Sequence, residues 1–357
     1  MVVGHYIWSA GIGGIEKLTI DLARTQTLNG ITPHLLIGKN KGEWLPVVQQ
    51  GFKYTCCNLS NGYFTSLQSL RSMRSFFATV DVIHLHTFHP MVCWCAMRSG
   101  KPIVYHVHGN WTSGRAEKIT DKIKRYLLRT FLTKYVRIVL FNSAYTQQRF
   151  SALFNLDTNI NCVIHNGCVA VAPINNQVST TKFVVGSCGR LATVKRMDRV
   201  LFAFTLFAKN KTDVQLTLVG DGPLMNELKL LAKQLNITKL VNFVGASNNV
   251  TNELAQFTVA VLGSQGESFG LVAIECLQQN KPTLVYADGG GLTEIMQLVD
   301  AKNITNNDDD MSNLLNVYYL QWKANNLNFE FTPHWRNYFS INRFERDVAN
   351  VYTQVLQ

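Results

Sequence analysis

The stretch Glu267-Ser-Phe-Gly-Leu-Val-Ala-Ile-Glu275 places two carboxylates eight residues apart, with a Phe-Gly pair between them. A helix that starts near Phe269 puts Glu267 on the preceding loop and Glu275 about two turns inside the helix. The backbone N–H groups at such a start have no partner within the helix and suit phosphate or sugar oxygens. Taken alone, the stretch favours a plainer interpretation, a carboxylate stabilising a helix start and an exposed second carboxylate.

A second stretch, Val-Val-Gly-Ser-Cys-Gly-Arg-Leu at 184–191, is typical of a buried strand that runs into a glycine turn. Lys195 follows, and then an apolar helical run from Val200 to Phe207. Arg190 and Lys195 therefore lie between a strand and a helix, where ligands bind in open α/β sheets. In that setting two cations indicate a diphosphate site rather than a solvated basic turn.

Further motifs extend this pattern along the chain in a fixed order. They are Gly13-Gly14-Ile15-Glu16-Lys17, 81–86, 102–109, 163–167, Gly189-Arg190-Leu191 with Lys195, Gly220-Asp221-Gly222, Glu267…Glu275, Lys281-Pro282 and Gly290-Gly291-Leu-Thr-Glu294. In this combination the chain resembles the family 4 retaining glycosyltransferases over nearly its whole length, roughly residues 2 to 355. The resemblance implies an α/β protein with the B-type glycosyltransferase fold, two Rossmann-like domains whose parallel sheets face each other across a cleft.

The length of 357 residues is too great for one ordinary core, and short apolar stretches alternate with helical ones in both halves. Expected strands are 1–8, 32–37, 80–86, 103–108, 137–141, 161–164, 183–187, 215–219, 240–244, 259–262 and 283–286. We expect an acceptor-side basic domain at 1–170, a polar linker at 171–181 and a nucleotide-sugar-binding domain at 182–335. The family's final helix, at 336–357, is expected to pack back on the first domain.

The resemblance also implies roles for individual residues. Arg190 and Lys195 hold the donor diphosphate and stabilise the leaving group, Glu275 accepts the ribose hydroxyls, and Glu267 positions the donor sugar. The backbone N–H groups of the next four residues help Glu267 to position the donor sugar and phosphates. These residues are Ser268, Phe269, Gly270 and Leu271.

The first domain is expected to contribute Gly13 and Gly14, which let the backbone approach the diphosphate, and His108, which contacts the transferred sugar. His108, Arg190, Lys195 and Glu267 are thus the expected catalytic residues. The neighbouring histidines are expected to be structural, although one of them could line the acceptor side: His84, His86, His89 and His106.

Three positions depart from the family pattern. Arg196 stands where glycine usually follows the lysine, Asn280 replaces the helix-ending glycine, and Cys168-Val169 replaces the usual aspartate after Asn166-Gly167. Asn is the next-best residue for a left-handed helix end, so we expect the turn at Asn280 to be kept.

The net charge of +11 lies wholly in the first part of the chain. Residues 1–165 contain 18 Lys+Arg and 7 Asp+Glu (18 − 7 = +11), whereas residues 166–357 contain 16 of each. One predicted helical stripe carries Arg115, Lys118, Lys122, Arg125 and Arg129, beside an apolar face of Ile119, Ile123, Tyr126, Leu127 and Phe131. Such a helix fits an anionic membrane surface. The alternative is a surface helix that packs on its own domain. No motif indicates nucleic-acid binding.

These features predict a cytoplasmic transferase, peripheral on the inner face of the membrane. The eight cysteines lack metal or disulfide spacing, no secretory segment is evident, and no apolar run approaches membrane-spanning length. No Asp-x-Asp motif suits a divalent ion, so we expect no metal or other cofactor.

The expected substrates are a nucleotide-sugar donor and a glycan or lipid-linked acceptor of bacterial surface polysaccharide or lipopolysaccharide. Alternatives are a non-catalytic nucleotide-sugar-binding subunit of a polysaccharide assembly complex and a nucleotide-sugar epimerase of similar fold. A dinucleotide-dependent oxidoreductase is disfavoured, because Glu16 occupies the place of the third fingerprint glycine.

Overall fold

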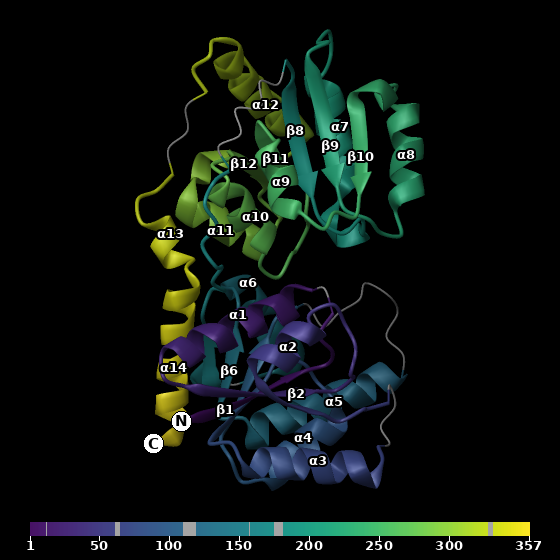
Figure 1. Ribbon diagram of the computed structural model, residues 1–357. Helices are drawn as coiled ribbons and strands as arrows, with labels where there is room; N and C mark the ends of the chain where they lie inside the picture. Colours follow the sequence, from purple (N-terminus) through teal and green to yellow (C-terminus); the bar gives the residue numbers. More distant parts are fainter. Residues whose placement is uncertain (12, 61–64, 110–118, 157, 175–180, 328–330) are drawn as a thin grey trace. The chain divides into compact units, whose positions relative to one another are not determined.

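The chain folds into two compact units, Met1–Val169 with Phe339–Gln357 and Ala170–Tyr338 (Figure 1). The computed structural model describes all residues except 12, 61–64, 110–118, 157, 175–180 and 328–330. Each unit has a parallel sheet flanked by helices, which confirms the prediction of two Rossmann-like α/β domains.

The first unit is built on a sheet of strand order β3-β2-β1-β4-β5-β6-β7, in which every pair is parallel. Its strands are β1 Val2–Ile7, β2 Thr32–Ile37, β3 Lys53–Cys56, β4 Val82–Leu85, β5 Ile103–Val107, β6 Ile138–Phe141 and β7 Asn161–Val163. Its helices are α1 Gly14–Leu28, α2 Leu45–Gly51, α3 Leu67–Ala78, α4 Pro90–Arg98, α5 Ile119–Tyr135, α6 Ala144–Phe154 and α14 Ile341–Leu356. Because helices cover both faces, the central strands are buried throughout.

Helix α14, at the end of the chain, belongs to the core of this first unit. It lies beside α1 (Figure 1), and its Phe344, Val348 and Tyr352 pack with apolar residues of the sheet such as Val82 and Val104. The helix lies within the expected segment 336–357 but begins only at Ile341, after the separate short helix Trp335–Tyr338, and the Ser340 side chain accepts a hydrogen bond from the N–H of Arg343 at its start.

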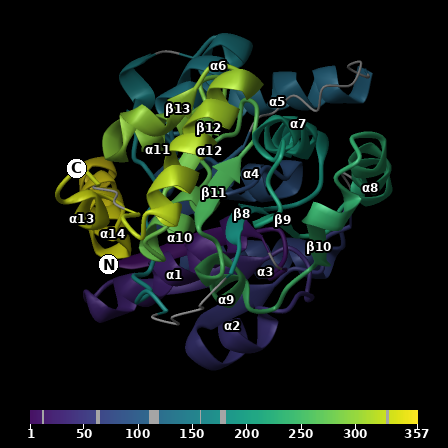
Figure 2. The ribbon, with the colours of Figure 1, turned by 90° about the horizontal axis from the view of Figure 1, so that it is seen from above.

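The second unit has the parallel strand order β10-β9-β8-β11-β12-β13. Its strands are β8 Phe183–Cys188, β9 Val214–Val219, β10 Val241–Gly245, β11 Val259–Leu262, β12 Thr283–Tyr286 and β13 Ile304–Thr305. Its helices are α7 Met197–Phe207, α8 Met225–Gln234, α9 Val250–Ala255, α10 Leu271–Gln278, α11 Gly291–Val299, α12 Asp308–Lys323 and α13 Trp335–Tyr338. Helices α7 and α12 pack against each other in the core (Figure 2).

Strand order reverses direction once in each sheet, between β1 and β4 and between β8 and β11. In open α/β sheets the crevice at the carboxyl ends of such a strand pair is where ligands bind. The residues that follow β8 and β11 therefore lie at the expected ligand position of the second unit.

Two strands were not predicted from the sequence. Strand β3 forms one edge of its sheet, and the four residues Lys-Tyr-Thr-Cys lack an apolar run. Strand β13 has only two residues, too few to form an apolar run. Helix α12 follows it and begins at Asp308, where the Asn307 side chain accepts a hydrogen bond from the N–H of Asp310.

Candidate functional site

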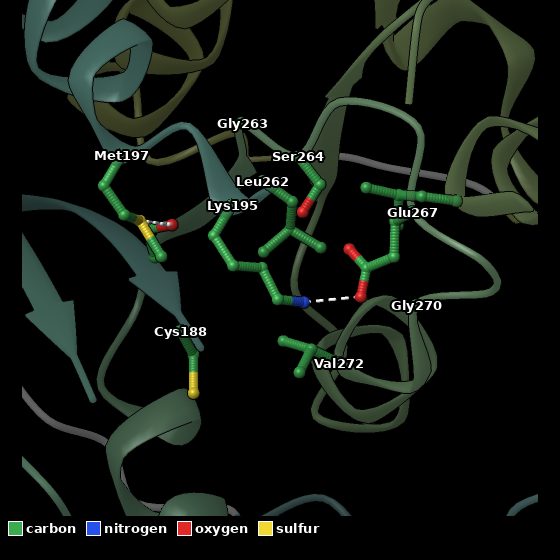
Figure 3. A pocket seen from close by; sticks show the side chains of 11 residues that line it. Cys188, Lys195, Met197, Leu262, Gly263, Ser264, Glu267, Gly270 and Val272 are labelled. Atoms are coloured by element: carbon green, nitrogen blue, oxygen red, sulfur yellow. Dashed lines mark hydrogen bonds and ion pairs between the residues drawn. The ribbon is translucent and has the colours of Figure 1, made fainter. Parts of the chain in front are cut away.

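A pocket of the second unit lies at the carboxyl ends of β8 and β11, the strands between which the order reverses (Figure 3). The pocket is small and partly open to solvent. Its lining residues come from the two strand ends, from the segments after them and, for Leu292, from α11: Ser187, Cys188, Lys195, Met197, Leu262, Gly263, Ser264, Glu267, Gly270, Val272 and Leu292.

An ion pair between Lys195 and Glu267 lies in this pocket. The Lys195 Nζ donates to Glu267 Oε1 at 2.5 Å, and both side chains are mostly buried, with 17% and 18% of their surfaces exposed. Figure 3 shows the two side chains pointing toward each other from opposite sides of the pocket. Since β8 and β11 are neighbours in the sheet, the turns that follow them meet here although 72 residues separate the pair.

Backbone hydrogen bonds hold the loop of Glu267 beside the start of α11. The N–H of Glu267 donates to the carbonyl of Gly289 at 3.0 Å, and the N–H of Gly291 donates to the carbonyl of Glu267 at 2.8 Å. A Cβ atom on Gly291 would collide with the backbone of Ser268, so only glycine permits this approach. The glycine pair identified in the sequence thus fixes the position of the Glu267 carboxylate.

Helix α10 begins at Leu271, two residues later than the expected start near Phe269. Gly270 precedes it with φ 103°, a left-handed conformation that side chains rarely adopt, and this residue redirects the chain into the helix. The N–H groups of Leu271 and Val272 have no acceptor within the helix because of their position in its first turn. Gly270 and Val272 line the pocket, so this helix start borders it.

Arg196 follows Lys195 in a left-handed conformation, with φ 45° and ψ 47°. This explains the usual preference for glycine at the position, since a left-handed residue with a side chain is strained by about 1–2 kcal/mol. The guanidinium compensates through hydrogen bonds to both carboxylate oxygens of Asp198, at 2.9–3.1 Å, and to Gln265 Oε1 at 3.0 Å.

The same polar network extends to Asp288, a residue that lies outside the sequence motifs. Its carboxylate accepts hydrogen bonds from Arg199 at 2.7 Å and from Gln265 at 3.0 Å. The guanidinium of Arg199 also lies over the ring of Tyr286, 3.9 Å from its centroid. The only sequence signal was the basic run at 195–199, which does not reveal partners on the loops after β11 and β12.

The other residues predicted for the second unit surround the pocket without lining it. Arg190 is exposed in the turn after β8, Ser268 is half-buried, and Phe269 is buried. Glu275 is half-buried on α10, and its charge, after burial itself, raises the pKa of the Cys188 thiol to about 12. Because Cys188 lines the pocket, Glu275 is close enough to influence it electrostatically.

The predicted residues of the first unit are Gly13, Gly14 and His108. Gly13 precedes α1 in an extended conformation and Gly14 is the first residue of that helix. His108 directly follows β5 and is half-buried, with its Nε2 2.9 Å from His86 Nδ1 and its carbonyl accepting from Asn142 Nδ2 at 3.1 Å. Burial lowers the pKa of His108 to about 3, so its imidazole is neutral at pH 7.

Helix α5 carries the predicted basic stripe, of which Lys122, Arg125 and Arg129 are described; Arg115 and Lys118 lie outside the described residues. The apolar face predicted beside the stripe divides into two parts. Phe131 is buried in the core with Leu128 and Leu132. The other four side chains are exposed: Ile119 by 77%, Ile123 by 49%, Tyr126 by 69% and Leu127 by 41% of its surface.

Across the described part of the chain, the structure contains no helix with the length and apolar character needed to cross a membrane.

Comparison with known families matches both units. Residues 12–169 match the family described as Glycosyltransferase Family 4, and residues 173–319 match the family described as Glycosyl transferases group 1. Together the two matches leave residues 1–11, 170–172 and 320–357 uncovered.

Individual relatives resemble the chain over most of its length. An uncharacterized glycosyltransferase of Haemophilus influenzae is 24% identical over 319 residues, 83% of each protein. The N-acetylgalactosamine-N,N'-diacetylbacillosaminyl-diphospho-undecaprenol 4-alpha-N-acetylgalactosaminyltransferase of Campylobacter jejuni is 23% identical over 298 residues, covering 77% of this chain and 78% of the relative. The fold is similar to the crystal structure of Anabaena HepE in complex with UDP and glucose, with a TM-score of 0.79 at 18% identity and coverage of 99% and 100%.

Proposed function

Because this chain belongs to the glycosyltransferases of the family 4 type and has their two-domain GT-B fold, we propose that it transfers a sugar from a nucleotide-diphosphate-sugar to a hydroxyl of a glycan or lipid-linked acceptor. The observation that carries the proposal is the Lys195–Glu267 pair in the pocket between the ends of β8 and β11. A cation, a carboxylate and a helix start converge there, and these are the groups that a diphosphate and a sugar need. The crystal structure of HepE with UDP and glucose supports a donor of this class.

In the proposed mechanism Lys195 leaves its pairing with Glu267 in part and contacts the donor phosphates. Its ammonium stabilises the charge that develops on the departing nucleotide, a task that a metal ion performs in other transferases. Arg190, exposed beside the pocket, provides a second cation for the diphosphate. We also propose that the transfer proceeds without a metal ion bound to the donor.

Glu267, once released from Lys195, accepts hydrogen bonds from sugar hydroxyls, and the N–H groups from Ser268 to Leu271 contact the phosphates. Glu275 accepts the ribose hydroxyls. From the first unit, Gly13 and Gly14 contact the diphosphate and His108 contacts the transferred sugar. We propose retention of anomeric configuration, as the family resemblance implies. Front-face attack is preferred because Glu267, the one carboxylate that lines the described pocket, is assigned to the sugar hydroxyls and no second carboxylate lines that pocket to act as a nucleophile.

Thermal unfolding in the presence of candidate donors tests this function. The full chain is heated with UDP-, GDP-, ADP- and CMP-sugars and with the free nucleotides, each with and without EDTA. A donor at 100 times its dissociation constant adds about 2.7 kcal/mol of stability. We expect one donor class to raise the melting temperature equally with and without EDTA, and Lys195→Ala to reduce this shift while the exposed Lys233→Ala does not.

Transfer itself is then measured as nucleotide release that depends on an added acceptor. Donor binding without any transfer would favour the non-catalytic subunit, whereas interconversion of the sugar would favour the epimerase. No donor-dependent shift for any nucleotide-sugar would contradict the proposed donor site.

We further propose that α5 places the enzyme on an anionic membrane on the cytoplasmic side. The exposed residues Ile119, Ile123, Tyr126 and Leu127 lie on the same helix as Lys122, Arg125 and Arg129, the combination that binds lipid headgroups. The diphospho-undecaprenol-linked substrate in the name of the Campylobacter jejuni relative supports a lipid-linked acceptor.

Flotation with vesicles that contain anionic lipid tests the membrane proposal. Replacement of Lys122, Arg125 and Arg129 by Glu is expected to abolish binding. The matched control replaces three exposed lysines of the second unit, Lys229, Lys233 and Lys239, and changes the net charge equally. Equal loss in both variants would show that net charge alone attracts the protein, and no loss in either would refute a role for α5.

A further inference from the structure

Five histidines form a cluster on one face of the first unit's sheet. His5 lies on β1, His84 and His86 lie on and directly after β4, and His106 and His108 lie on and directly after β5. These strands are neighbours, and His5 is directly opposite His84 in the register. Within each strand the histidines are two residues apart, so their rings point to the same face. All but His108 are buried, and helices α1 and α14 cover them through Gln26 and Tyr352.

Hydrogen bonds account for only part of the polar atoms in this histidine cluster. His5 bonds to Gln26 Oε1 at 2.8 Å and to His86 at 3.1 Å, while His86 bonds to His108 at 2.9 Å. His106 is only 1% exposed, and both of its ring nitrogens are buried without a hydrogen-bond partner. Buried polar atoms nearly always have a partner, so His106 indicates a ligand of another kind.

The positions of the nitrogens suit a metal ion. His86, His106 and His108 each offer one ring nitrogen, and the three atoms lie within 4.8 Å of one another. Two imidazole ligands of a tetrahedral zinc ion, with Zn–N bonds of 2.0–2.1 Å, have nitrogens about 3.3 Å apart. The 2.9 Å between His86 Nδ1 and His108 Nε2 is slightly shorter than this separation, and the three nitrogens all lie within 4.8 Å of one another, so small side-chain shifts would reach it.

The hydrogen-bond chain behind His86 leaves the correct nitrogen available. Gln26 donates through its Nε2 to the hydroxyl of Tyr352 at 3.3 Å, which leaves its Oε1 as an acceptor for an N–H on His5 Nε2. A neutral His5 then accepts at Nδ1 from His86 Nε2, so the lone pair of His86 lies on Nδ1. That nitrogen faces His108, and histidine ligands of metals are oriented in this way by hydrogen bonds from their other nitrogen.

One edge of the cluster is accessible to an ion. His108 is half-buried, whereas the other four histidines are buried, so a metal ion would enter on the side of His108.

We propose that His86, His106 and His108 bind one Zn²⁺ ion, with a fourth position open to an oxygen ligand on the side of His108. Three histidines with one open position are an established arrangement for zinc, and imidazole suits zinc better than it suits magnesium or calcium. This site is built from the first unit alone and shares His108 with the proposed sugar contact. No step of the transfer proposed at Lys195 and Glu267 uses the metal.

Metal titration of the full chain, prepared without a polyhistidine tag and stripped with a chelator, tests the site. We expect one zinc ion per chain by isothermal titration calorimetry and by elemental analysis after desalting. Cobalt should give the intense visible absorption of a four-coordinate site. Gln26→Leu, which removes the acceptor for His5, is expected to weaken zinc binding by roughly 10- to 100-fold.

The substitution His106→Leu distinguishes a metal-binding role of His106 from a purely structural role. It should abolish stoichiometric binding and, in the metal-free protein, raise the melting temperature because the two unpartnered nitrogens are removed. The control His334→Asn removes an exposed histidine of the second unit in a left-handed conformation that Asn tolerates, and should leave zinc binding unchanged. If His106→Leu does not fold, His108→Gln at the half-exposed edge replaces it.

Two results would overturn the proposal. One is the failure of the stripped protein to take up zinc or cobalt, which would show that the histidines form a hydrogen-bonded network only. The other is zinc uptake that persists unchanged in His106→Leu or His108→Gln, which would assign the metal to other surface groups. Donor binding is measured as the difference in melting temperature between samples with and without donor at the same EDTA concentration. Neither zinc result therefore affects the test of transferase function.

Discussion

At the scale of single residues, the Lys195–Glu267 ion pair is the feature that the sequence could not provide. The two residues were predicted separately, one for the phosphates and one for the sugar. Their contact depends on β8 and β11 being neighbours, which is a property of the strand order and not of either motif. The pair also keeps each charge compensated in a mostly buried position until a substrate supplies new partners.

Lys195→Ala is expected to reduce kcat by about 100-fold, with a smaller effect on donor binding, because its charge matters most as the phosphate departs. Steady-state kinetics with the donor identified by thermal unfolding measure both constants. Lys233→Ala is the control. A rise in KM at unchanged kcat would instead assign Lys195 to donor positioning alone.

Glu275→Ala is expected to raise the donor KM by about tenfold or more, because a charged hydrogen bond to the ribose hydroxyls contributes about 1.5–3 kcal/mol. The exposed acid of α8, Glu227, provides the matched control Glu227→Ala. Comparison of UDP-type donors with their 2'-deoxy analogues gives an independent measure. Unchanged discrimination between ribose and deoxyribose in Glu275→Ala would contradict the assignment.

At the scale of secondary-structure elements, local sequence determined how helices end. Asn280 replaces the usual glycine after α10, and its φ of 55° confirms the predicted left-handed turn. Arg196 adopts the same conformation, and its guanidinium is held by Asp198, two residues away, and by Gln265, a partner 69 residues away that local sequence does not reveal. Strands with strong apolar runs were predictable, whereas β3 and β13 are defined by their neighbours and were not.

Asn280→Ala and Asn280→Gly form a matched pair that tests the turn. Both lose the 2.7 Å hydrogen bond from Arg336 to the Asn280 side chain, but only alanine is strained in the left-handed conformation. We expect Asn280→Ala to be less stable than Asn280→Gly by about 1 kcal/mol in urea unfolding. Equal stabilities would show that the turn relaxes to another conformation.

His34 on β2 makes the first unit sensitive to acid. Burial, followed by the charge of Lys53, lowers its pKa to about 4, against about 6.5 in an unfolded chain. Between these values the unfolded chain binds more protons, so stability falls as pH decreases from about 6.5 to 4, by up to about 1.4 kcal/mol per pH unit. Urea unfolding at pH 7.5, 6 and 5 is expected to show a smaller slope for His34→Gln, and identical slopes would contradict this.

At the scale of the whole molecule, the second unit is an insertion within the first. The chain leaves the first unit after Val169 and returns at Phe339, so the core under β4 and β5 is completed only by α14. The family resemblance provided this expectation; the apolar spacing of α14 alone predicts an amphipathic helix but not the sheet on which it packs.

Phe344→Ala should therefore destabilise the first unit by about 3–5 kcal/mol, because a fully buried ring is removed from its core. The control is Phe202→Ala on α7, where the ring is 40% exposed and the expected loss is smaller. Calorimetry can follow the two units separately, with donor used to identify the transition of the second. Equal losses in both variants would contradict the role of α14 in the core.

The return of α14 also sets an order for events during protein synthesis. When the ribosome has finished residue 338, the second unit has its complete sequence, while the first still lacks the helix that covers its buried histidines. The unit whose synthesis begins first is therefore the last to complete its fold. The apolar face of its sheet that α14 later covers stays uncovered by that helix during translation of the 169 residues from Ala170 to Tyr338. Ribosome-bound chains arrested before residue 341 should therefore be good substrates for chaperones, and released chains should not.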